Sequence, residues 1–111
     1  MLKFAKIDVT ASGDNIIVVG STYPNRRIRI LSFNLITDAD VIVKFKSGAS
    51  GDLTGPMPLA AYGGIATTSS YISNIQPIGQ FETLASNDNL ILNLSGAANI
   101  GGNIVYYVLT G

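Results

Sequence analysis

The sequence predicts an all-β fold, a single antiparallel β-sandwich with jelly-roll-like topology that occupies residues 1–111 as one domain. β-branched and aromatic runs of about five to ten residues alternate with Gly, Asn, Asp and Pro along the whole chain, which is typical of all-β proteins. No long run repeats its apolar residues at the helical period. Apolar residues make up 47% of the 111 residues, enough for one interior but not for two independent cores.

The first part of the chain contains two expected strands. Residues 3–11 alternate apolar with polar positions, so a strand here has one apolar face. That face carries Ala5, Ile7, Val9 and Ala11. A turn at 12–14 leads into a second strand at 15–20. The next turn is expected at 23–25, where proline presets φ and asparagine tolerates a tight backbone conformation.

The longest expected strand, residues 26–37, changes the parity of its apolar positions. Ile28 and Ile30 share one parity, and the apolar residues that follow share the other, namely Leu31, Phe33 and Leu35. Strict alternation cannot produce this change. We therefore expect a β-bulge near residues 30–32.

The middle of the chain combines one clear strand with irregular segments. A hairpin at 38–40 is expected to lead into a strand at 41–46, with Val41, Val43 and Phe45 facing inward and Lys44 and Lys46 facing water. Two prolines restrict 53–59 to a sheet edge or an irregular segment. Residues 66–78 are polar and show no period, which predicts a long surface loop of the kind that is often functional.

The last third of the chain returns to clear strands, expected at 80–85, 90–95 and 103–109. The Gly/Ala/Asn-rich segment 96–102 is interpreted as a hairpin turn. Neither Gly63–Gly64 nor Gly101–Gly102 matches a phosphate-binding pattern, so both pairs are interpreted as turn glycines. The alternation places four large residues in the core: Phe33, Phe45, Leu92 and Ile104.

The residue types exclude most enzyme chemistry. The chain has no His and no Cys, which removes most nucleophile–base pairs and most transition-metal sites. Glu82 and Asp52 are interpreted as solubilising charges, not as a general acid–base pair. Asp38 and Asp40 lack the further oxygen ligands and the glycine of a calcium loop. We therefore predict that the protein is not an enzyme and has no catalytic, cofactor-binding or metal-binding residue.

The charges and basic residues argue against nucleic acid and membrane as partners. Only 13% of residues are charged, about half the usual share of ~25%, and a weakly repelling surface suits packing against other proteins. Arg26, Arg27 and Arg29 form the one dense basic patch, but no aromatic residues interleave with it. We expect a solvated strand face or salt bridges to a neighbouring subunit there. No stretch approaches the ~18 apolar residues of a membrane span.

Loop tyrosines are the candidate anchors of a protein interface, because tyrosine gives a large rigid contact area at low entropic cost. Tyr62 lies beside the expected Gly63–Gly64 turn, and Tyr71 lies within the expected long loop. Residues 1–46 hold all seven basic residues and carry a net +3, whereas residues 47–111 carry a net −3 and no basic residue. We expect this second part to form the contact surface.

Six segments together carry a resemblance to a known group of proteins: residues 26–32, 41–48, 53–56, 59–64, 79–83 and 90–95. The series resembles small β-sandwich proteins of tailed bacteriophages, over roughly residues 3–109. In length and style the chain also resembles the capsid decoration, or cement, proteins of short-tailed phages, which have a jelly-roll fold.

The resemblance implies a structural virion protein. Such a protein would bind the major capsid protein on the outer surface of the phage head, tie capsomers together, and act as a homo-oligomer, either a dimer or a trimer. It would be assembled in the host cytoplasm. The alternative is a tail or fibre component that binds a host receptor or a glycan. A nucleic-acid-binding barrel would need a basic aromatic groove, at which only the arginine cluster hints.

Overall fold

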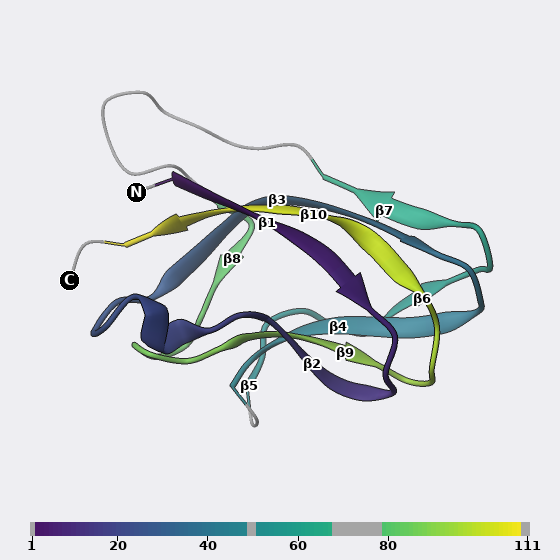
Figure 1. The fold of residues 1–111 in the computed structure, drawn as a ribbon, viewed down its shortest axis with the longest axis horizontal. Coiled ribbons are helices and arrows are strands. Elements are labelled where there is room, and N and C mark those ends of the chain that lie inside the picture. The colour runs from purple at the N-terminus through teal and green to yellow at the C-terminus, as the bar shows by residue number, and fades with distance from the viewer. Residues whose placement is uncertain (1, 49–50, 68–78, 110–111) are drawn as a thin grey trace.

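The computed structural model describes residues 2–48, 51–67 and 79–109. It is an antiparallel β-sandwich of two five-stranded sheets, stacked one above the other in Figure 1. The first sheet consists of β1 (Leu2–Val9), β10 (Ile100–Val108), β3 (Ile28–Thr37), β7 (Gly64–Ala66) and β8 (Phe81–Glu82). The second consists of β2 (Gly13–Val18), β9 (Leu90–Leu94), β4 (Val41–Ser47), β5 (Gly51–Asp52) and β6 (Met57–Leu59). A 3-10 turn, η1 (Gly20–Thr22), follows β2.

The strand pairing is nested, and this defines the topology. The first strand β1 pairs with the last strand β10, and β2 pairs with β9. One step further in, β3 pairs with β7 and β8, and β4 pairs with β5 and β6. This order arises when one long hairpin is rolled up, so that β10 also pairs with β3 and β9 also pairs with β4. It is the jelly-roll form of the β-sandwich, as expected from the sequence.

The core lies between the two sheets and confirms the predicted inward positions. Phe45, Leu92 and Ile104 are fully buried and Phe33 is 6% exposed. The rings of Phe33 and Phe45 lie edge to face with centroids 4.9 Å apart, a favoured aromatic geometry. Because the two rings come from strands of opposite sheets, this contact joins the two layers.

The predicted β-bulge is confirmed on β3. Val105 of β10 lies opposite Ser32, and the next residue, Tyr106, lies opposite Ile30. Leu31 is therefore the extra residue, and it is 1% exposed. The bulge is how β3 buries apolar residues of both parities.

Several predicted boundaries and turns were wrong. The predicted strand at 80–85 is paired only at Phe81–Glu82. Ala11 is exposed in a bend beyond the end of β1. The predicted hairpin at 38–40 instead joins strands of different sheets, because β3 and β4 do not pair. Turn composition marks a change of direction but does not show which sheet the next strand joins.

The glycine pair Gly101–Gly102 lies inside β10 and not in a turn, since β10 begins at Ile100. Its position has a steric reason, because a Cβ at position 102 would collide with the backbone carbonyl of Asn34 on β3. Glycine within a strand often marks such a close approach of two backbones. Of the predicted loop at 66–78, residues 68–78 lie outside the described residues.

Candidate interaction surface

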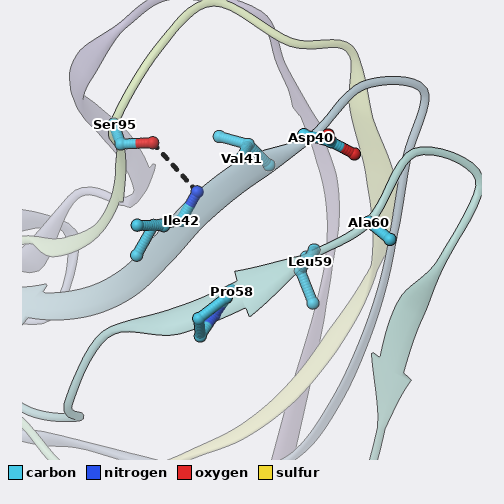
Figure 2. A pocket seen from close by; sticks show the side chains of 7 residues that line it. All are labelled: Asp40, Val41, Ile42, Pro58, Leu59, Ala60 and Ser95. Atoms are coloured by element: carbon cyan, nitrogen blue, oxygen red, sulfur yellow. Dashed lines mark hydrogen bonds between the residues drawn. The ribbon is translucent and has the colours of Figure 1, made fainter.

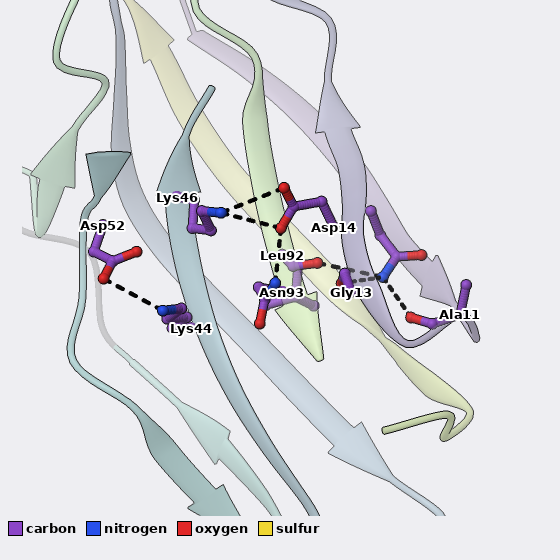
Figure 3. A network of polar contacts seen from close by, with 9 residues as sticks. Ala11, Gly13, Asp14, Lys44, Lys46, Asp52, Leu92 and Asn93 are labelled. Carbon is purple, nitrogen blue, oxygen red and sulfur yellow. Dashed lines mark hydrogen bonds and ion pairs between the residues drawn. The ribbon is translucent and has the colours of Figure 1, made fainter. Parts of the chain in front are cut away.

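The outer face of the second sheet carries a network of charges (Figure 3). Lys46 Nζ lies 3.3 Å from a carboxylate oxygen of Asp14, and Lys44 Nζ lies 3.3 Å from Asp52. Asn93 donates a hydrogen bond of 2.7 Å to Asp14, and this bond is the main reason why the pKa of Asp14 is lowered. Cations and anions alternate across neighbouring strands, as suits a face in contact with water.

Two exposed isoleucines flank this network. Ile16 and Ile42 are 54% and 45% exposed, and the row that contains Asp14, Asn93 and Lys44 lies between their positions on the sheet. The apolar residues of this face are therefore separated by polar ones. They do not form a continuous patch.

The outer face of the first sheet also mixes apolar and polar side chains, because the row Lys6–Asn103–Asn34 lies between the rows of Phe4 and Ile36. Its described strands expose Leu2, Phe4 and Ile36, with Phe4 73% and Ile36 65% exposed. Phe4 lies opposite Val105 in the register of β1 and β10. We call this surface, together with Tyr62, the first-sheet face. Apart from Tyr62, its exposed apolar residues lie within residues 1–46 and not within 47–111, the part that the charge distribution favoured. Contiguous exposed apolar surface often marks an interface, and on this face Ile36 and Tyr62 lie together around one hollow.

Tyr62 projects at one end of the first-sheet face and is 84% exposed. Its backbone has a φ of 64°, which is unusual for a bulky residue, and its N–H donates to the carbonyl of Thr37 at 2.8 Å. Together with Ile36 and the Gly101–Gly102 pair, it lines a hollow of about 350 Å³. A turn that exposes an aromatic side chain from a strained backbone position is consistent with the predicted role of Tyr62 as an interface anchor.

Polar groups close one side of this hollow. Asn99 donates from its backbone and from its side chain to the Asp38 carboxylate, at 2.9 and 2.6 Å. The backbone hydrogen bond is the main cause of the lowered pKa of Asp38. The two residues join the start of the β3–β4 link to the segment before β10. They hold the rim of the hollow in place.

The predicted arginine cluster is divided in the structure. Glu82 binds two of its members, Arg27 through Oε2 at 2.9 Å and Arg29 through Oε1 at 2.9 Å. We expected a solvated face or salt bridges to a neighbouring subunit, but these ion pairs lie within the chain, because β8 places Glu82 directly opposite Arg29. Arg26 is exposed in the segment before β3. The three arginines stay predicted interface residues, while Tyr71 lies outside the described residues.

A second hollow, of about 630 Å³, lies beside β4 and β6 (Figure 2). Its lining residues are Asp40, Val41, Ile42, Pro58, Leu59, Ala60 and Ser95. Asp40 is the one titratable side chain in this lining, and its Oδ1 accepts a hydrogen bond from the N–H of Ala61 at 2.8 Å. General acid–base catalysis needs a positioned proton donor and acceptor near a reacting group. These lining residues do not supply such a pair.

The carboxylates weighed as an acid–base pair have separate partners. Asp52 pairs with Lys44 in the second sheet, whereas Glu82 pairs with arginines in the first. Within the described ranges, no group of three or more potential metal-ligating side chains comes together. The described part of the chain also contains no helix long and apolar enough to cross a membrane.

Sequence reasoning missed the exposed apolar residues of β1. Phe4 lies on the polar face of a strand whose other face holds Ala5 and Ile7. An apolar residue out of phase with the core pattern was the signal available in the sequence. That β1 is an edge strand could not be read locally, because it depends on pairing with β10 about a hundred positions away.

The comparisons with known proteins establish the fold. No protein-family model and no curated protein matches the chain. A chain from the solved structure of Bacillus endospore appendages, described as a novel family of disulfide-linked pili, has a similar fold. The TM-score is 0.54, the sequence identity is 19%, and the match covers 99% of this chain and 88% of that chain.

Proposed function

We propose that the protein is a structural subunit, not an enzyme, and that it docks through the first-sheet face onto a larger protein assembly. The contrast between the two outer faces carries this proposal. On the second sheet, paired charges separate Ile16 from Ile42, whereas on the first Ile36 and Tyr62 lie together around one hollow. Charges that are already paired gain little from a protein partner, whereas exposed apolar side chains gathered around a hollow gain free energy when they are covered.

The assembly that we propose is a phage head. The support is the resemblance of six sequence segments to small phage β-sandwich proteins, together with the jelly-roll topology. On the outer surface of the capsid, the chain would bind the major capsid protein and tie capsomers together. A ligand that binds only the assembled shell stabilises it by mass action. The contact should exceed the ~1,000 Å² expected of a specific interface. A tail or fibre component that binds a host receptor or glycan is the alternative position.

A pilus-like filament is a second candidate, supported by the fold shared with a chain of the Bacillus appendage. That appendage is described as disulfide-linked, and the 111 residues here contain no Cys. Copies of this chain in a filament would therefore need non-covalent contacts within these residues. Electron microscopy of the purified protein would show filaments under this candidate and discrete particles under the first.

Attachment to purified heads tests the proposal. Heads from cells that produce the protein should carry it on their outer surface in cryo-EM maps, and heads stripped of it should rupture at lower temperature. Ile36→Ser should reduce attachment at least about tenfold, because a contact worth ~1.4 kcal/mol changes an affinity by that factor. Ile16→Ser is the matched control, since Ile16 is similarly exposed but lies on the second sheet. Tyr62→Ala tests the predicted anchor in the same assay.

Three results would contradict parts of the proposal. Absence of the protein from purified heads would remove the capsid position, and its presence on tails would support the alternative. Equal loss of attachment in Ile36→Ser and Ile16→Ser would remove the first-sheet face as the docking surface. Full occupancy and full heat resistance with Tyr62→Ala would remove Tyr62 as an anchor.

A further inference from the structure

β1 is the longest edge strand in the part of the chain that the structure describes. It runs over eight residues, Leu2–Val9, and pairs with β10 without a register shift. Among the described strands, β10 is its only partner, so no described strand pairs with the other side of β1 (Figure 1). An open edge presents N–H and C=O groups to which a strand of another molecule can pair.

The other described edges are blunted. The edge strand β2 is shorter and contains a register shift between Ile16 and Val18. On the far side of the sandwich, β5, β6, β7 and β8 have two or three residues each, and β6 contains Pro58. Short strands, bulges and proline are the devices by which proteins prevent edge pairing. β1 has none of these three.

The charges on β1 are also without partners inside the molecule. Lys6 and Asp8 are exposed on its outer face, Lys3 is partly buried on the opposite face, and none of the four ion pairs between described residues includes any of the three. In the same part of the chain, every acidic side chain except Asp8 has an ion-pair or hydrogen-bond partner. These residues are Asp14, Asp38, Asp40, Asp52, Glu82 and Asp88. Asp8, the acidic side chain without such a partner, therefore lies on the edge strand β1.

The order of these charges makes β1 complementary to an antiparallel copy of itself. Two residues that lie opposite each other in an antiparallel pair point to the same face of the sheet. In a two-fold dimer, opposite positions of β1 therefore differ by an even number, and the axis lies level with one residue. An axis at Ile7 places Lys6 of each copy opposite Asp8 of the other, and the strands then pair over Ala5–Val9, since residues 2–4 fall opposite 10–12, beyond the end of β1. An axis at Lys6 would place two lysines opposite each other, which is unfavourable. An axis at Ala5 would place Lys6 opposite Phe4.

We propose that two copies of this chain form a dimer by antiparallel pairing of their β1 strands about a two-fold axis at Ile7. Lysine on an edge strand usually protects it against pairing, and β1 carries Lys3 and Lys6. In this register, however, Lys6 faces Asp8 and Lys3 lies level with Ala11, so no lysine faces another lysine. The two first sheets then join into one continuous sheet. Both copies of the first-sheet face point to the same side of it, because the axis is perpendicular to the sheet.

The role of the joined face rests on the proposed function, and the dimer deepens that function. Two linked docking surfaces on one sheet attach with a higher effective affinity than either alone. The dimer also fixes the choice between dimer and trimer that the sequence left open. A two-fold contact is closed, so it adds no further copies through β1.

Charge exchange on the full chain tests the dimer, with mass in solution measured by sedimentation equilibrium at low ionic strength. Lys6→Asp places acidic groups opposite each other, and Asp8→Lys places basic groups opposite each other. Each should raise the dimer dissociation constant about tenfold or more, the factor that corresponds to ~1.4 kcal/mol. An equimolar mixture of the two variants should form a heterodimer at least as tight as the parent dimer, and the double variant should recover parent affinity.

Asp52→Lys is the control for a charge reversal elsewhere, because Asp52 is exposed on the second sheet. It should leave the dissociation constant unchanged, and circular dichroism should show that all variants keep the β fold. A parent protein that is monomeric at all concentrations would overturn the proposal. So would single variants that dimerise like the parent, or growth into open chains. Attachment to heads is measured separately, so a monomer that still binds heads would refute the dimer and leave the docking function intact.

Discussion

The hydroxyl groups of Tyr23 and Tyr106 lie 2.9 Å apart and share a hydrogen bond, although the residues are 83 positions apart in the sequence. Their rings meet edge to face with centroids 6.2 Å apart. Tyr23 ends the η1 turn and Tyr106 faces the core from β10, so the pair fastens the β2–β3 connection to the first sheet. Burial, reinforced by the bond to Tyr23, raises the pKa of Tyr106 above its usual range.

The first prediction follows from this raised pKa. Above pH ~10, the unfolded chain loses the Tyr106 proton while the folded chain keeps it, so the stabilisation is complete below that pH and declines as the pH rises. In urea titrations, the parent should lose more stability between pH 8 and pH 11 than Tyr106→Phe. At pH 8, Tyr106→Phe should cost about 0.5–1.5 kcal/mol, the usual value of one hydrogen bond. Equal alkaline losses in both proteins would contradict the prediction.

The second prediction concerns the core. Phe45→Ala and Leu92→Ala should each lower the free energy of unfolding by about 2–5 kcal/mol, because each leaves a cavity at a fully buried position. The ring of Phe45 also lies 5.3 Å from that of Phe81, so part of its loss should fall on the β8 segment. Phe33→Ala and Phe45→Ala should not be additive, since the two rings are in contact. Variants that melt within a degree or two of the parent would show that the strand register is wrong.

Local patterns in the sequence were sufficient for the core and for the bulge. Alternation identified Phe33, Phe45 and Leu92 as inward positions, and a change of parity marked the bulge at Leu31. Both features depend on neighbours within a few residues, which is the range over which strand periodicity holds. The spacing of short strands and turns predicted a β-sandwich and favoured the jelly roll, but the strand pairing that defines this topology is not local.

Features that depend on distant pairing were beyond the sequence. Arg29 meets Glu82 because β8 pairs with β3, a contact between residues 53 positions apart. Gly102 is required inside β10 because Asn34 of β3 lies against it, whereas its composition suggested a turn. The first-sheet face likewise combines residues of β1 and β3 with a turn residue, Tyr62. The sequence identified single residues of the site, but it did not show which distant residues lie beside them in the fold.

The third prediction is a loss of stability in acid. Asp14 and Asp38 have lowered pKa values, mainly through hydrogen bonds from Asn93 and Asn99 respectively. Their contribution to stability is therefore present above pH ~4 and is lost as the pH falls through the lower pKa values of the folded protein. Asp14→Asn removes one of these groups, so its urea midpoint should fall less than that of the parent between pH 6 and pH 2. An identical fall would contradict the role of Asp14.

The fourth prediction compares two adjacent glycines of β10. Gly102→Ala should destabilise the fold by about 1–3 kcal/mol, since the added methyl group meets the backbone carbonyl of Asn34 and forces the strands apart. Gly101→Ala is the matched control, because its Cβ would have no neighbour within 4 Å. It should change stability by no more than about 0.5 kcal/mol. Urea unfolding of the two variants measures both effects.

The same pair separates stability from docking. Gly101 lines the hollow beside Ile36 and Tyr62, so the methyl group of Gly101→Ala enters the first-sheet face without disturbing the sheet. This variant should keep the melting temperature of the parent and attach to purified heads more weakly, because the hollow becomes shallower. Normal attachment by Gly101→Ala, measured beside a weakened Ile36→Ser, would show that the partner covers Ile36 but does not enter the hollow. Normal attachment by both would mean that docking uses another surface.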